Sequence, residues 1–173
     1  MEAGGEVYFE NITEIFKEKI NAVSGGDICV QAYYFTDKMI ADLLIRAKQR
    51  SANILVLMDR NGAVSKYSVV PYLIRNGIQV RCDYADEKAH NKVMIMDGVG
   101  VITGSYNYTV SASKYNAENV IFINDKNVFQ KYKSNFNERW NKAFEFVIIP
   151  KDLKIVGNKA NVITYKGERN VNV

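Results

Sequence analysis

The chain has 173 residues, 47% hydrophobic and 24% charged, with two cysteines and a formal net charge of +4. This length suffices for one domain with a real core, without disulfide or metal staples, and the composition is that of a soluble globular protein. Residues 1–149 are nearly neutral, with 18 basic and 17 acidic side chains, which argues against a broad surface that coats nucleic acid.

Helical and extended patterns alternate along the first half of the chain. A short edge strand at 7–9 precedes apolar residues at helical spacing, and Gly25 and Gly26 end that helix. The next expected elements are a buried strand at 28–35, an amphipathic helix at 37–50, a strand at 54–58, a loop at 59–62, a helix at 67–75 that begins near Pro71, and a strand at 78–82.

A hairpin opens the second half, after a polar loop at 83–89. Its strands at 92–96 and 99–103 flank Asp97-Gly98, a strong hairpin pair. A short helix at 109–115, a strand at 119–123 and a long helix at 126–144 follow. This alternation predicts an α/β fold with a mixed central β-sheet flanked by helices.

The last residues differ from the rest in composition. Residues 150–173 hold five basic side chains against two acidic ones, Pro150 breaks the preceding helix, and residues 161–165 favour an extra strand. We therefore predict a catalytic domain at 1–149 and a basic C-terminal extension at 150–173. The extension is either a docking or nucleic-acid-contacting element, with a regulatory protein as one partner, or a loosely attached appendage.

Cysteine usage and the first residues bear on the compartment. Cys29 and Cys82 lie in apolar runs without CxxC spacing or histidine partners, which favours buried reduced thiols over a zinc site. The first eight residues lack a basic region followed by an apolar one, as a signal peptide would need. We expect a cytoplasmic protein without a membrane anchor; a periplasmic or secreted location is the alternative if a signal peptide was removed.

His90 is the one histidine of the chain and begins the run HNKVMIMDGVGVITGSYN. On an extended segment, side chains two positions apart point to the same side, so His90 and Lys92 pair an imidazole with a fixed cation. A largely neutral imidazole is a nucleophile, and an ammonium holds a phosphate oxygen. Phosphoryl transfer of this kind needs a second imidazole to protonate the leaving group, so we expect a homodimer.

The spacing H-x-K-x4-D-x6-G-S-x-N resembles the phospholipase D superfamily, and in particular its small bacterial endonucleases with one motif per chain. Upstream, residues 31–36, 47–50 and 56–60 are similar to that group's first strand, first long helix and second strand. Downstream, residues 118–122 and Trp140 fall where those enzymes have them. The resemblance covers residues 7 to about 146.

The resemblance implies covalent catalysis by histidine. One subunit's His90 attacks phosphorus, and the same residue of the partner protonates the leaving alcohol and then activates water. Lys92, Ser105 and Asn107 would hold the phosphate, with the bend at Gly104 allowing close approach. Glu118 matches the family position whose carboxylate holds the other ring nitrogen of the nucleophile.

Other residues have supporting parts. Asp97 is explained as a hairpin residue that orients neighbouring loops. Tyr106 and Tyr108 flank Asn107 and are candidates for base stacking or for lining the groove, while Arg60 and Lys114 are candidates for contacts to backbone phosphates. No pattern of metal ligands accompanies the motif, so we expect no cofactor and activity that survives EDTA.

The leading hypothesis is a metal-independent endonuclease, acting on DNA more than RNA. One alternative is a phospholipid phosphodiesterase of the phospholipase D or cardiolipin type, favoured by the apolar run at 144–149 near a basic tail. Another is the nuclease effector of a defence or mobile-element system, restrained by a partner protein. An inactive binding module is disfavoured, because all the motif residues are present.

Overall fold

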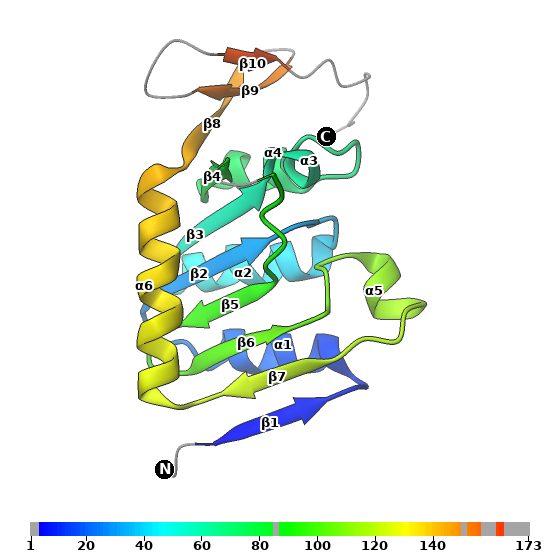
Figure 1. Ribbon diagram of the computed structural model, residues 1–173, viewed down its shortest axis with the longest axis vertical. Coiled ribbons are helices and arrows are strands. Elements are labelled where there is room, and N and C mark those ends of the chain that lie inside the picture. The colour runs from blue at the N-terminus through cyan, green and yellow to red at the C-terminus, as the bar shows by residue number, and fades with distance from the viewer. Residues whose placement is uncertain (1–3, 85–86, 150–151, 157–161, 165–173) are drawn as a thin grey trace.

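The computed structural model describes residues 4–84, 87–149, 152–156 and 162–164, with side-chain surroundings to residue 146. Over these residues one ten-stranded mixed sheet runs through the molecule in the order β1-β7-β6-β5-β2-β3-β4-β8-β9-β10 (Figure 1). The strands are β1 (Gly5–Tyr8), β2 (Gly26–Ala32), β3 (Ala52–Asp59), β4 (Gln79–Asp83), β5 (Val93–Met96), β6 (Gly100–Gly104), β7 (Val120–Ile123), β8 (Phe144–Ile149), β9 (Asp152–Val156) and β10 (Val162–Thr164). β2, β3 and β4 are parallel, and the remaining pairs are antiparallel.

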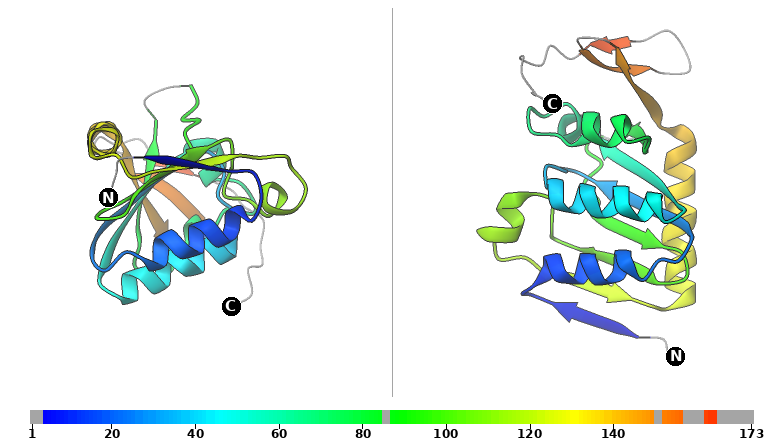
Figure 2. Two further views of the ribbon diagram at one scale, coloured as in Figure 1. Left: turned by 90° about the horizontal axis from the view of Figure 1, so that it is seen from below. Right: turned by 180° about the vertical axis from the view of Figure 1, so that it is seen from behind.

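Helices cover both faces of the sheet. They are α1 (Ile12–Asn21), α2 (Lys38–Gln49), α3 (Arg60–Ala63), α4 (Val70–Arg75), α5 (Val110–Lys114) and α6 (Lys126–Lys142). α1 and α2 lie side by side on one face, and α6 crosses the strands on the other (Figures 1 and 2). This arrangement confirms the predicted α/β fold with a mixed central sheet.

Two apolar cores follow from alternation along the strands. The larger core packs the sheet against α1 and α2 and includes Phe16, Leu44 and Val56. The smaller one lies under α6, where Phe136 packs on residues of β2, β3, β5 and β6. Because a central strand is buried on both faces, β5 is apolar at every position, as its sequence VMIM shows.

The β5–β6 hairpin lies antiparallel beside β2. Val93 is opposite Gln31 on β2 and opposite Thr103 on β6. At the far end of the hairpin, Asp97 Oδ2 accepts a hydrogen bond from the Asp27 backbone N–H at 2.9 Å. This hydrogen bond joins the hairpin turn to the start of β2 and fixes the register of β5.

Lys133 of α6 joins the same end of the sheet. Its Nζ lies 2.7 Å from Asp27 Oδ2 and 3.1 Å from Asp97 Oδ1. Burial alone would raise the pKa of Asp27, but hydrogen bonds from Lys133 and Asn53 outweigh it and hold the pKa below its ordinary value of 3.8. One ammonium therefore links α6, β2 and the hairpin.

Two predicted elements differ from the structure. In place of the loop predicted at 59–62, residues 60–63 form the helical turn α3, because the Asp59 carboxylate accepts hydrogen bonds from Asn61 N and Gly62 N. The long helix, predicted to reach residue 144, ends at Lys142, since Phe144 pairs with Cys82 and starts β8.

The C-terminal strands extend the sheet past β4. β10 confirms the strand predicted within 161–165, of which only 162–164 lie in the described part. The division at residue 149 remains a prediction, although β9 pairs directly with β8. No helix in the described residues is both long and apolar enough to cross a membrane.

Replacing Lys133 by Met tests the ionic link. The change leaves two partly exposed carboxylates without their cation, so we expect the free energy of unfolding in urea to fall by about 1–2 kcal/mol. Because the folded-state pKa of Asp27 is lowered, its contribution is present above its unfolded pKa of 3.8 and disappears as the pH falls through the folded value. The difference between wild type and variant should therefore shrink at acidic pH.

Lys142→Met is the matched control. The Lys142–Glu138 pair is on the same helix, but its side chains are 62% and 65% exposed. Because water screens a pair this exposed, removing it should leave the free energy of unfolding nearly unchanged. Equal losses in the two variants would contradict the link.

Candidate active site

Three neighbouring strands place the motif residues at one edge of the sheet. β5 begins, β6 ends and β7 begins at this edge, where β2 and β3 also end (Figure 1). His90 and Lys92 precede β5, Ser105 and Asn107 follow β6, and Glu118 precedes β7. Antiparallel pairing thus gathers residues that are distant in sequence, and we call this the catalytic edge.

His90 and Lys92 are in direct contact. Lys92 Nζ lies 3.2 Å from His90 Nδ1 and 3.4 Å from Nε2, and it donates to the His90 carbonyl oxygen at 2.7 Å. The Tyr33 ring, just beyond β2, lies 4.5 Å from the imidazole centroid. The imidazole is exposed. An imidazole open to solvent is therefore held between a cation and an aromatic ring.

The Lys92 side chain is buried, with 8% of the residue exposed. Burial lowers the pKa of its ammonium below 10.5, and the nearby Glu118 carboxylate partly opposes that shift. A desolvated cation attracts an anion more strongly than a hydrated one does. Lys92 is therefore suited to bind a phosphate oxygen beside the imidazole.

Ser105 and Glu118 form the other side of the site. Ser105 Oγ donates to Glu118 Oε2 and accepts from the Asn119 backbone N–H at 3.1 Å. The second oxygen of Glu118 accepts from Asn116 Nδ2 at 2.9 Å. These bonds join the end of β6 to the start of β7.

This arrangement differs from the expected role of Glu118. Its carboxylate was expected to hold a ring nitrogen of His90, whereas the hydrogen bonds described for it go to Ser105 and Asn116. The reason is local: the residues before β7 bring the carboxylate against the end of β6. Its charge still acts on the site, since it favours the ammonium form of Lys92.

Gly104 makes the bend that carries the chain from β6 into the site. Its φ is +157°, and a Cβ there would lie 2.2 Å from the Asn119 carbonyl oxygen. Only glycine allows this approach. Beyond the bend, Asn107 Oδ1 is buried without a hydrogen-bond partner in the described structure, so this oxygen is free to accept a hydrogen bond.

The expectation that Tyr106 and Tyr108 contact substrate is wrong. Each is only 1% exposed, and both pack on Phe16 of α1, with ring centroids 5.7 and 5.5 Å apart. Side chains alternate in an extended chain, so the neighbours of a residue that faces the site, Asn107, turn into the core. Neither ring face is free for a base.

The remaining predicted residues separate by position. Arg60 and Lys114 are exposed and follow β3 and β6 at the catalytic edge; Arg60 Nη1 donates to the Tyr84 hydroxyl at 2.7 Å. Asp97 lies at the opposite end of β5, where its contacts to Asp27 and Lys133 fit the expected orienting part.

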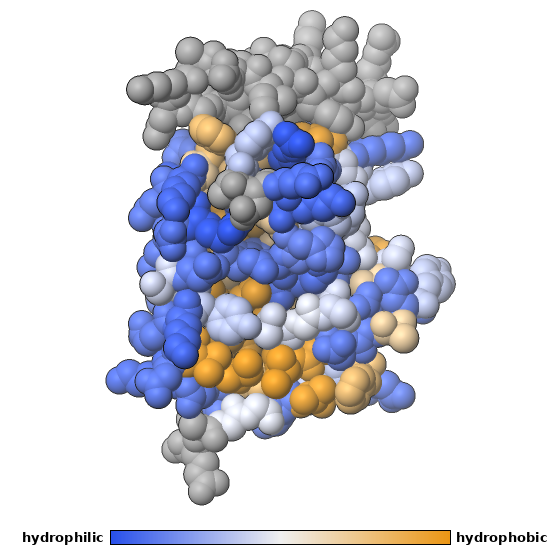
Figure 3. Space-filling model, in the orientation of Figure 1, coloured by the Kyte–Doolittle hydropathy of each residue, from blue (hydrophilic) through white to orange (hydrophobic). Residues whose placement is uncertain are grey.

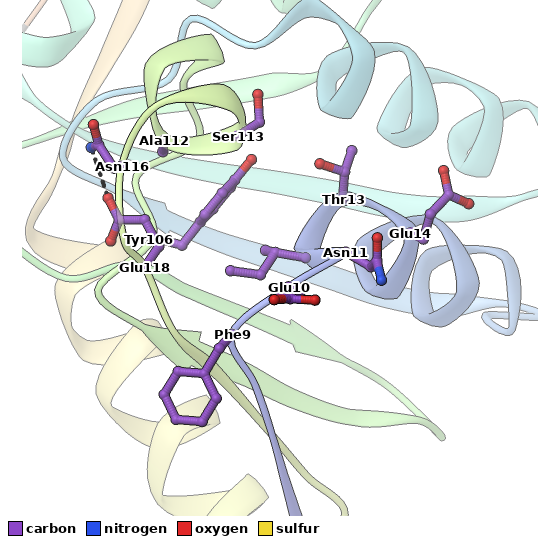
Figure 4. A pocket seen from close by; sticks show the side chains of 11 residues that line it. Phe9, Glu10, Asn11, Thr13, Glu14, Tyr106, Ala112, Ser113, Asn116 and Glu118 are labelled. Atoms are coloured by element: carbon purple, nitrogen blue, oxygen red, sulfur yellow. Dashed lines mark hydrogen bonds between the residues drawn. The ribbon is translucent and has the colours of Figure 1, made fainter.

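A pocket of about 250 Å³ opens beside Glu118, between the start of α1 and α5 (Figure 4). Its charged lining residues are Glu10, Glu14 and Glu118. Three carboxylates without a lining cation repel an anion, whereas the ammonium of Lys92 attracts one. Within the described residues, no three His, Cys, Asp or Glu side chains gather as a metal site would require.

Sequence reasoning gave Tyr33 no role, and it missed Asn116 at this edge and Lys133 at the opposite end of the sheet. Tyr33 lies two residues beyond Gln31, the partner of Val93 on β5, so the β2–β5 register alone would have placed it near His90. No sequence signal marks Asn116 or Lys133, because their contacts depend on how a loop and a helix pack.

Comparisons with known proteins agree with this geometry. The family model described as "Cardiolipin synthase, PLD-like domain" matches residues 16–140. The phospholipase D of Rickettsia prowazekii is 43% identical over 112 residues, which make up 65% of this chain and 55% of that protein. The mitochondrial cardiolipin hydrolase of Xenopus laevis is 28% identical over 128 residues, 74% of this chain and 60% of that protein. The chain thus spans a little over half the length of these curated relatives.

Solved structures share the fold. Nuc from Salmonella typhimurium, a phospholipase D family member, superposes with a TM-score of 0.78 at 27% identity, over 85% of this chain and 100% of that chain. NucT from Helicobacter pylori has a TM-score of 0.74 over 82% of this chain and 98% of its own, and its 18% identity speaks for the fold alone.

Lys92→Met tests whether a charged ammonium is buried at this position. Because the pKa of Lys92 is lowered in the folded state, its charge opposes folding near pH 7, and stability is gained as the pH rises through the folded value toward 10.5. We expect the variant to be at least as stable as wild type at pH 7 in thermal unfolding, with this advantage vanishing above pH 10. An advantage that grows with pH would contradict the burial of a charged Lys92.

Proposed function

The chain belongs to the phospholipase D-like family, and we propose that it is a metal-independent phosphodiesterase that hydrolyses nucleic acid, DNA more readily than RNA, through a phosphohistidine. The observation that carries this proposal is the contact between the buried ammonium of Lys92 and the exposed imidazole of His90. It supplies a nucleophile and a phosphate-binding cation at one point.

The first step forms a bond between a ring nitrogen of His90 and phosphorus. The bond from phosphorus to the leaving oxygen breaks, and a protonated imidazole on the other side of the phosphate gives its proton to that oxygen. Lys92 balances the charge of the phosphoryl oxygens, and the Asn107 amide adds a donor.

In the second step water attacks phosphorus. The imidazole that gave up its proton accepts one from the water, and the phosphorus–nitrogen bond breaks, which restores His90. The product is a phosphate monoester. Ser105 and Glu118 keep the end of β6 against the start of β7, so the loop that carries Asn107 holds its position.

The second imidazole implies a second copy of the chain, because His90 is the one histidine in the sequence. An apolar area lies on the sheet face that carries α6 (Figure 3). Registers put Val7, Ile121 and Ile123 on this face, and Val7 is 53% exposed. An uncovered apolar sheet face next to the catalytic edge supports a two-fold homodimer in which both motifs meet.

A phospholipid is the second candidate substrate. The names of the Rickettsia and Xenopus relatives favour it, since these are a phospholipase D and a cardiolipin hydrolase. Nucleic acid is favoured by the resemblance to single-motif endonucleases and by the cations at the catalytic edge, Arg60 and Lys114.

Cleavage in excess EDTA tests the proposal. We expect wild type to cut labelled DNA without a divalent ion and His90→Ala to be inactive, while Asn107→Ala should lose about 100- to 1000-fold in rate. Glu10→Gln, in the neighbouring pocket, is a control that keeps the motif intact.

Phosphatidylglycerol and cardiolipin vesicles serve as the competing substrates. Hydrolysis of lipid without hydrolysis of any DNA or RNA would overturn the nucleic-acid assignment and keep the phosphodiesterase chemistry. Loss of cutting in EDTA, restored by magnesium, would overturn the metal-independent mechanism.

Subunit mixing tests the shared site. If each site needs both imidazoles, wild type refolded with an equal amount of His90→Ala should retain about a quarter of its activity, because only wild-type pairs are active. With activity expressed per total chain, wild type and variant together, a retained half would show that each chain works alone.

A further inference from the structure

The three most exposed aromatic rings of the described residues all lie at the catalytic edge. They are Tyr67, Phe9 and Tyr115, exposed by 70%, 71% and 79%. Phe9 follows β1, Tyr67 lies in the loop between α3 and α4, and Tyr115 ends α5. Rings this exposed are available to contact a ligand.

Two of these rings stand on opposite sides of the motif. The α3–α4 loop follows β3, and the residues after α5 lead into β7. In the sheet, β5 lies two places from β3 and two places from β7. With neighbouring strands about 4.8 Å apart, the loops flank His90 across about 19 Å; Figures 1 and 2 show both on the same side of the sheet.

Each of the two tyrosines has a lysine directly before it in the chain. Lys66 and Lys114 are both exposed, and Lys66 Nζ lies 5.3 Å from the centroid of the Tyr67 ring. A flat ring next to a mobile ammonium presents a stacking surface together with a phosphate contact. Proteins bind single-stranded nucleic acid with this combination of aromatic rings that stack on bases and cations that contact phosphates.

Phe9 is different, because it borders the pocket that holds Glu10, Glu14 and Glu118 (Figure 4). Phe9 also has no lysine directly before it and is followed by Glu10, so a phosphate backbone is repelled there rather than held. The favoured path runs from Tyr67 past His90 to Tyr115.

We propose that Tyr67 and Tyr115 stack on bases on the two sides of the scissile phosphate, with Lys66 and Lys114 contacting the flanking phosphates. This rests on the proposed function and narrows its substrate to single strands, because paired bases within a duplex do not offer their faces to a ring. The two tyrosine–lysine pairs add affinity for longer strands, while the chemistry remains with the motif.

The experiment measures binding by the full-length chain carrying His90→Ala, so that no substrate is consumed. The probes are a labelled eight-nucleotide single strand, a dinucleotide and an eight-base-pair duplex. Tyr67→Leu with Tyr115→Leu keeps apolar bulk but removes both ring faces. We expect it to weaken binding of the eight-nucleotide strand by roughly tenfold per ring, and to remove most of its advantage over the dinucleotide.

Three comparisons sharpen the result. Tyr67→Phe with Tyr115→Phe keeps the rings and should bind the single strand as the parent does. Lys66→Met with Lys114→Met should lower the slope of the logarithm of the binding constant against the logarithm of the salt concentration. The expected decrease is the one for the loss of about two phosphate contacts. Lys131→Met, an exposed lysine on α6, is the control for a general loss of charge.

The Leu variants also separate bases from lipid. If the rings insert into a membrane interface, the double Leu variant should bind phosphatidylglycerol vesicles as well as the His90→Ala parent does. The eight-nucleotide strand should then bind the parent and the double Leu variant equally. These two results together would overturn the inference. If the parent binds no nucleic acid at all, the proposed function fails with it. Single-strand binding that the Leu variants do not weaken overturns the stacking assignment alone.

Discussion

The antiparallel insertion of the β5–β6 hairpin beside β2 is the constraint on which the site depends. Reversing β5 would carry His90 and Lys92 to the opposite edge of the sheet, and shifting it by one residue would turn them to the other face. The register is fixed at the far end of the strand, where Asp97 binds the backbone of Asp27 and Lys133 joins both carboxylates. The chemistry at one edge of the sheet is thus aligned by an ionic cluster at the other.

Lys92 is a residue at which the proposed function opposes the stability of the fold. Its ammonium is buried beside an aromatic ring and a histidine, which is costly for a charge. The partial compensation comes from Glu118, whose carboxylate is itself occupied by Ser105 and Asn116. A phosphate oxygen next to Lys92 would add a second negative charge beside this ammonium, so phosphate binding would favour its charged form.

Sequence alone predicts the sheet, its helices and the gathering of the motif, because these depend on periodicity and on strand pairing. It does not predict the partner of Glu118, since that hydrogen bond depends on the path of the few residues before β7. The burial of Tyr106 and Tyr108 could have been predicted from the sequence. Once Asn107 is assigned to the site, the alternation of side chains places its two neighbours in the core. The sequence carries no signal that Tyr67 and Tyr115 are exposed, because their exposure depends on how the loops pack.

The most direct test of the account is to trap the covalent intermediate. Single-turnover reaction with a labelled phosphodiester is quenched at alkaline pH in EDTA and followed by mass spectrometry of the digested chain. The peptide that contains His90 should carry the phosphorus together with the ester group that does not leave. The adduct should be labile in acid and absent from His90→Ala. Full turnover with no adduct at any reaction time would contradict a histidine nucleophile and leave direct attack by water as the mechanism.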